Sequence, residues 1–146
     1  MRSETEIAYL AGILDGEGCI TLVRNQGPAG YEDRTYYRLV VNVTNTDAGL
    51  LDWIAQRWPD CRLGVVNVGK AAERAKDCLR LTWTGPRALG LLSQVRPYLV
   101  AKAGQADIAV RFRATGDYRG RPVPQHVNDE RAALVDEIRA LNRKGR

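Results

Sequence analysis

The stretch YLAGILDGEG, residues Tyr9–Gly18, joins an apolar run to two acids and two glycines. Ser3 is a potential N-cap upstream of it, and the periodicity that follows predicts a helix over about residues 4–15. The apolar positions at helical spacing are Ile7, Leu10, Ala11 and Leu14. Asp15 and Glu17 then fall at the C-terminal end of the helix, where the macrodipole disfavours negative charge. Acids in this position need a compensating partner or role.

Small residues form a stripe along the predicted helix, because Ala8, Gly12 and Gly16 are spaced four apart. Such a stripe lets another backbone approach closely, and we expect that backbone to be the same helix of a second copy. This pairing would bring both Glu17 carboxylates together, which is costly unless cations bind between them. Paired carboxylates that recruit divalent cations suit phosphodiester hydrolysis. The alternative is that the acids are simply exposed and screened by water.

The glycines that follow the apolar run have a second predicted role. Gly16 and Gly18 are expected to end the helix in the left-handed conformation that helices commonly use.

The rest of the chain alternates between strand-like and helical periodicity. We predict strands over about residues 19–26, 34–45, 61–69 and 75–84, and helices over about residues 46–58, 85–95, 101–115 and 129–145. The predicted fold class is α+β, a four-stranded antiparallel sheet with helices on one face and an open face that needs a partner. The length predicts one domain, residues 1–146, with a core of about residues 4–115 and a C-terminal helical extension of about residues 125–144.

Composition and charge limit the classes of protein. Hydrophobic residues make up 45% and charged residues 27%, and no apolar run approaches the roughly 20 residues that span a bilayer. We see no signal peptide and expect a cytoplasmic protein with no membrane partner. Three cysteines and one histidine fit neither a disulfide framework nor a zinc site. The net charge is −4 over residues 1–60, +4 over residues 61–95 and +5 over residues 96–146, which suggests a polyanion held near a carboxylate site.

The segment Leu10–Gly18, LAGILDGEG, resembles the motif that names the LAGLIDADG homing endonucleases. The predicted element order is similar to that family's αββαββα core, so the resemblance covers nearly the whole chain. Members with one motif act as homodimers, and this chain has one motif. The resemblance therefore implies a divalent-metal-dependent endonuclease that cuts both strands of a long, nearly palindromic duplex DNA site and leaves 3′ overhangs. It also implies an organellar matrix location if an organelle intron encodes the chain.

The resemblance also implies roles for individual residues at the end of the motif. Glu17 would be the catalytic metal ligand, the backbone carbonyl of Gly16 would contribute, and Asp15 would brace the paired helices. The cofactor would be Mg²⁺, with Mn²⁺ or Ca²⁺ able to occupy the same sites. Asn45, at the end of the second strand, would hold a metal-bound water, and Lys102 would position water or stabilise the phosphorane charge. The plainer alternatives are a strand-end residue and a solvated lysine. The residues expected at the dimer interface are Ala8, Ala11, Gly12, Asp15 and Gly16.

In that family the open face of the sheet follows the major groove of DNA. The residues that would lie on this face are Thr21, Val23, Asn25, Tyr36, Arg38, Val40, Asn42, Arg80 and Thr82. Arginines there would pair with guanine, asparagines with adenine, and valines with a thymine methyl group. Lys70, Arg74 and Lys76 lie in the second hairpin's turn and would contact phosphate. The alternative is an ordinary solvated face.

Two other functions remain open on the sequence alone. One is a non-cleaving nucleic-acid binder of the same fold, either a maturase acting on its own intron RNA or a DNA-binding regulator. The other is a structural dimerisation domain, which would explain the small-residue stripe but neither the acids nor the basic later part of the chain.

Overall fold

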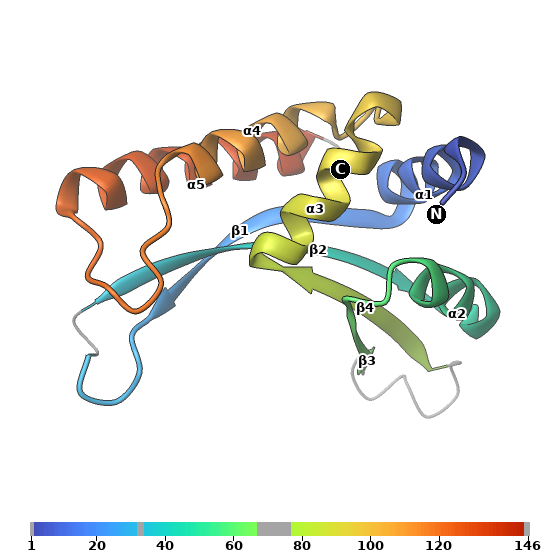
Figure 1. Cartoon of the computed structure of the whole chain (residues 1–146), viewed down its shortest axis with the longest axis horizontal. Helices are drawn as coiled ribbons and strands as arrows, with labels where there is room; N and C mark the ends of the chain where they lie inside the picture. The colour runs from blue at the N-terminus through green and yellow to red at the C-terminus, as the bar shows by residue number, and fades with distance from the viewer. Residues whose placement is uncertain (1, 32–33, 67–76, 145–146) are drawn as a thin grey trace.

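The computed structural model describes residues 2–31, 34–66 and 77–144 (Figure 1). Its elements are α1 (Glu4–Glu17), β1 (Gly18–Gln26), β2 (Thr35–Asn45), α2 (Ala48–Arg57), β3 (Arg62–Val66), β4 (Cys78–Thr84), α3 (Gly85–Val95), the 3₁₀ turn η2 (Arg96–Tyr98), α4 (Ala103–Ala114) and α5 (Gln125–Lys144). The predicted α+β class is confirmed. Among the described residues, no helix combines the length and the apolar character that crossing a membrane requires.

The four strands form one antiparallel sheet in the order β1-β2-β4-β3. Figure 1 shows the long helices α4 and α5, together with α1 and α3, lying on one side of this sheet. Strand residues alternate between that side and the other because successive side chains point to opposite faces. The sheet therefore has one face covered by helices and one open face, as the sequence predicts.

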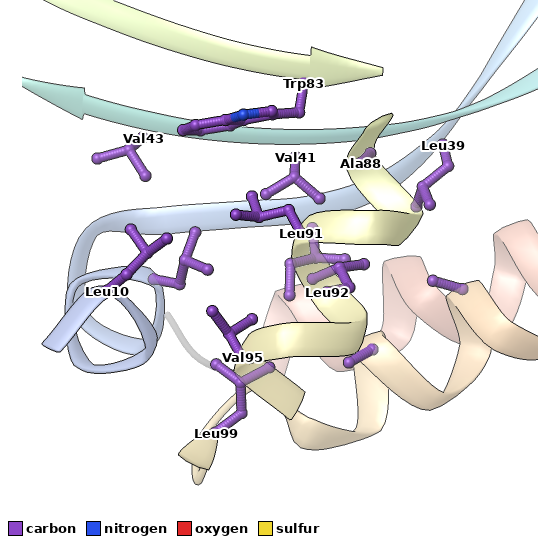
Figure 2. Close-up of a cluster of buried hydrophobic side chains, with 14 of the residues drawn as sticks. Leu10, Leu39, Val41, Val43, Trp83, Ala88, Leu91, Leu92, Val95 and Leu99 are labelled. Carbon is purple, nitrogen blue, oxygen red and sulfur yellow. The ribbon is translucent and has the colours of Figure 1, made fainter. Parts of the chain in front are cut away.

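The core lies between the sheet and the helices (Figure 2). Trp83 of β4 and Val41 and Val43 of β2 are almost completely buried. Leu10 of α1 and Leu92 of α3 meet them from the helical side. The apolar side of α1 and the apolar face of β2 thus lie on opposite sides of one core layer, as their helical and two-residue periodicities predict.

Helix α1 runs directly into strand β1, and this junction corrects the predicted left-handed stop. Gly18 caps the helix in an extended conformation (φ −89°, ψ 167°), and neither Gly16 nor Gly18 has a positive φ. Glycine is required at position 18 for a different reason, since a Cβ there would lie 2.8 Å from the backbone of Leu14. The helix consequently continues to Glu17, which becomes its last residue.

The C-terminal helix α5 begins earlier than the predicted residue 129. The carbonyl of Pro124 accepts hydrogen bonds from the backbone N–H groups of Val127 and Asn128, both at 3.1 Å, and so opens the helix at Gln125. Near the other end, the Asn142 side chain donates to the carbonyl of Ile20 in β1 at 3.2 Å. The helix is therefore held against β1 by a polar contact as well as by its apolar side.

Candidate active site

The C-terminal end of α1 is braced by a segment that is distant in sequence. The Asp15 carboxylate accepts hydrogen bonds from the backbone N–H groups of Val100 (2.8 Å) and Lys102 (2.9 Å). In return, the Lys102 ammonium donates to the backbone carbonyl of Asp15 at 2.7 Å. The last turn of α1 contains no basic residue of its own. Lys102 therefore supplies the cation that the negative end of the helix dipole favours.

Glu17 is held by Asn45 across the junction between α1 and the end of β2. The Asn45 side-chain amide donates to the Glu17 carboxylate. The Asn45 side-chain oxygen accepts from the backbone N–H of Asp47 at 2.8 Å, which fixes the amide with its NH₂ group toward Glu17. Glu17 itself is exposed. The structure thus joins Glu17 to Asn45 and ties Lys102 to Asp15, two residues earlier on α1.

The oxygen atoms at this end of α1 include some of the ligands that a hard divalent cation requires. Glu17 offers an exposed carboxylate, and oxygen ligands are those that Mg²⁺ prefers. Within the described ranges, no group of three or more His, Cys, Asp or Glu side chains could hold a metal ion. Mg²⁺ commonly uses only one or two carboxylates and completes its shell with water and substrate phosphates. Glu17 could therefore contribute one ligand to a metal ion whose shell a phosphate group or a second carboxylate would complete.

The open face of the sheet brings the predicted surface residues together. Thr21 pairs with Val40, Val23 with Arg38, Asn25 with Tyr36, and Asn42 with Thr82 across the strands. Directly paired residues point to the same face, so the hydrogen-bonding side chains of neighbouring strands lie together on one surface. The Arg80 guanidinium donates to the Thr44 hydroxyl at 3.1 Å, which fixes its direction on that face.

Some of the predicted surface residues differ from expectation. Val40 is only 8% exposed, because it lies on the central strand between Thr21 and Thr84, and it is therefore a poor candidate for contact with a partner. Lys70, Arg74 and Lys76 lie outside the described residues. Arg62 of β3, which is not among the predicted surface residues, is exposed, pairs with Thr82 and shares the open face. Its alternation with Leu63 was the available signal.

The small-residue stripe of α1 is only partly as predicted. Gly12 and Gly16 are exposed, and a Cβ built on either would meet no atom within 4 Å in the part of the chain that the structure describes. Ala8 is half-buried. Ala11, in contrast, is 0% exposed and packs in the core of its own chain, so its predicted place at a dimer interface is wrong. The Asp15 carboxylate is half-buried and engaged by residues 100 and 102 of its own chain.

The chain matches no protein-family profile and no curated protein. Among solved structures, it is similar to the homing endonuclease I-CvuI in complex with its target in the presence of Ca, with 22% identity and a TM-score of 0.75 over 94% of this chain and 82% of that one. It is also similar to the archaeal intron-encoded homing endonuclease I-Vdi141I complexed with DNA. That match has 12% identity and a TM-score of 0.69 over 96% of this chain and 86% of the other.

A third match is the group I intron-encoded homing endonuclease I-CeuI complexed with DNA. Here the identity is 16% and the TM-score 0.59, over 77% of this chain and 55% of that one. At identities this low, the structural similarity shows a shared fold and nothing finer. The fold that the motif implied is confirmed.

Replacing Asp15 with Asn tests the brace at the end of α1. An amide retains one acceptor oxygen but turns an NH₂ group toward the second backbone N–H, so we expect the free energy of unfolding to fall by about 1–3 kcal/mol. Urea denaturation measures this change. D52N, which alters an exposed acid of α2, is the matched control and should change the stability by less than about 0.5 kcal/mol. Equal stabilities for the two variants would contradict the brace.

Proposed function

We propose that this chain, which has the fold of the LAGLIDADG homing endonucleases, is a divalent-metal-dependent DNA endonuclease that acts as a homodimer. It would cut both strands of a long, nearly palindromic duplex site by phosphodiester hydrolysis and leave 3′ overhangs. The observation that carries this proposal is the position of Glu17. Its exposed carboxylate, fixed by Asn45, ends the helix that leads directly into the sheet with the open, hydrogen-bonding face.

An exposed, fixed carboxylate favours cleavage over binding alone. A protein that only binds nucleic acid gains nothing from a negative charge near phosphate, because the two repel each other. A carboxylate that shares a metal ion with the phosphate converts that repulsion into attraction. The non-cleaving binder of the same fold is therefore the less favoured function.

Glu17 and the Gly16 carbonyl would hold Mg²⁺ in each copy of the chain. When bound, Mg²⁺ supplies positive charge that lowers the pKa of water and stabilises the leaving oxygen of a phosphodiester. Asn45 keeps the Glu17 carboxylate in one orientation through its amide. Among Glu17, Asn45 and Lys102, Lys102 has the positively charged side chain. Its ammonium group, which donates to the Asp15 carbonyl, would stabilise the negative charge that develops on the phosphate.

A second copy of the chain would complete the site. Close packing of two α1 helices through Gly12 and Gly16 brings their C-terminal ends together, and both Glu17 carboxylates with them. The space around both glycines supports this packing, since no atom of the described residues would lie within 4 Å of a Cβ at either position. A dimer also extends two open faces along one duplex, which suits a nearly palindromic site.

The open face would read DNA in the major groove. Arg38 and Arg80 have donors that match guanine, and Asn25 and Asn42 have the paired donor and acceptor that match adenine. Thr21, Tyr36 and Thr82 add hydroxyl groups, and Val23 adds an apolar contact. Arg62 extends this surface onto β3.

Replacing Glu17 with Gln tests the proposed function. The amide keeps the shape of the side chain but removes the charge that would bind the metal, so cleavage should be lost while DNA binding is retained or strengthened. Cleavage and gel-shift assays on one duplex, selected by binding from a randomised pool, measure the two properties. E130Q, on the exposed side of α5, is the matched control.

Each outcome of this experiment has a distinct meaning. Cutting by the native protein and E130Q but not by E17Q supports the endonuclease. Cutting by E17Q at the native rate contradicts it. Binding without cutting by all three proteins would instead favour the non-cleaving binder.

Replacing Gly12 with Leu tests the second copy. Gly12 is exposed, a Cβ at this position would meet no described atom within 4 Å, and leucine favours helix, so the fold should be retained. The larger side chain would keep two α1 helices apart. Analytical ultracentrifugation should therefore give the 16.2 kDa mass of one chain for G12L and twice that mass for the native protein. G90L, at an equally open position of α3, should remain a dimer, and a dimeric G12L would contradict the proposed packing.

A further inference from the structure

The segment between α4 and α5, residues 115–124, lies beside an unpaired edge of the sheet. Strand β4 pairs with β2 from Val40 to Asn45, so residues 35–39 of β2 have no sheet partner on that side among residues 2–31, 34–66 and 77–144. Two cavities of about 260 and 410 Å³ separate this edge from the segment, and Tyr36, Tyr37 and Val123 line both. Figure 1 shows the segment leaving the helical layer and descending past β2 toward the side of the open face.

A buried arginine anchors the start of this segment. Arg131 of α5 is 7% exposed, and its guanidinium donates to the Thr115 hydroxyl and to the Gly116 carbonyl, both at 2.8 Å. The Cζ atom of the same group lies 4.7 Å from the centroid of the Phe112 ring and 5.5 Å from that of the Tyr118 ring. A cation that is withdrawn from water and satisfied in this way holds the backbone at the base of the segment in one place.

The tip of the segment presents two arginines from a fixed base. The Asp117 carboxylate accepts from Arg119 at 2.9 Å, and these hydrogen bonds lower the pKa of Asp117 to about 2, so it remains ionised near neutral pH. Arg121 donates to the Asp117 carbonyl at 2.7 Å and lies over the Tyr118 ring. The turn between the two arginines places Gly120 at φ 72°, a conformation that glycine adopts without strain.

The charge around this segment is strongly positive. Arg119 shares the smaller cavity with Arg38 of the open face and with Arg113 of α4. Arg113 and Arg119 contact the Asp117 carboxylate at 3.5 and 2.9 Å, while Arg121 donates to the backbone carbonyl of Asp117. The Arg119 side chain is 78% exposed, so part of its five-donor group remains available to a ligand. A repeating anion that runs along the edge of the open face is the partner that this arrangement fits.

We propose that residues 115–124 form an arm that contacts the phosphate backbone of duplex DNA through Arg119 and Arg121. The proposal rests on the proposed function, in which the duplex lies on the open face beside this edge. Arginine matches phosphate with paired donors, and prior fixation by Asp117, Tyr118 and Arg131 reduces the entropy lost on binding. Contacts to phosphate set affinity and position but carry no direct sequence information. The arm would therefore strengthen binding equally on every target.

The salt dependence of DNA binding tests the arm. Each phosphate contact contributes about one unit to the slope of log K against log salt concentration. R121Q should lower the magnitude of that slope by about 1, and R119Q/R121Q by about 2. Both variants should weaken selected and scrambled duplexes by the same factor. R121K, which keeps the charge, should keep the native slope, whereas a purely structural role would be lost in R121Q and R121K alike.

R139Q is the matched control, because it removes one exposed arginine from α5 and should leave the slope unchanged. The native protein, R139Q and R121Q are compared by fluorescence anisotropy on one labelled duplex across a salt series. A slope for R121Q equal to that of R139Q would overturn the arm while leaving native DNA binding, and with it the proposed function, intact. Absence of DNA binding by the native protein would overturn the proposed function and the arm together.

Discussion

The carboxylate of Asp15 fixes the backbone of residues 100 and 102 against the end of α1, and the geometry of the candidate site depends on this contact. Two acids, Asp15 and Glu17, lie at the C-terminal end of α1, where the helix dipole disfavours negative charge, and this contact stabilises one of them. Asp15 is satisfied by backbone donors, and Lys102 supplies a cation to the carbonyl end of the helix. Glu17 alone remains exposed, and Asn45 fixes its orientation. The chain itself thus stabilises the charge of Asp15, whereas the charge of Glu17 would be stabilised by the proposed metal ion.

The direct passage from α1 to β1 couples this site to the sheet. Because Gly18 allows the strand to begin immediately after the helix, Glu17 lies at the start of the open face rather than on a separate loop. The helices cover the opposite face completely enough to bury Trp83 and Val41. In the proposed function, the open face would bind duplex DNA so that phosphates reach Glu17 and bases meet residues such as Arg38.

Much of the fold could be predicted from the sequence, because local patterns determine it. The helix over residues 85–95 has a proline near its start and an apolar side, and the structure has it with the same bounds. The contact of Asp15 with residue 100 could not be predicted, since 85 residues separate the partners. Ala11 was misplaced because a small side chain fits a core and an interface equally well. Val40 is buried by its neighbours on both adjacent strands, which the pattern of one strand does not reveal.

Cleavage of a randomised duplex DNA pool with Mg²⁺, followed by sequencing of the ends, tests the proposed endonuclease function. We expect the native protein to yield one long, nearly palindromic site with 3′ overhangs. Duplexes that are bound and recovered intact, at every Mg²⁺ or Mn²⁺ concentration that leaves the protein folded, would contradict it.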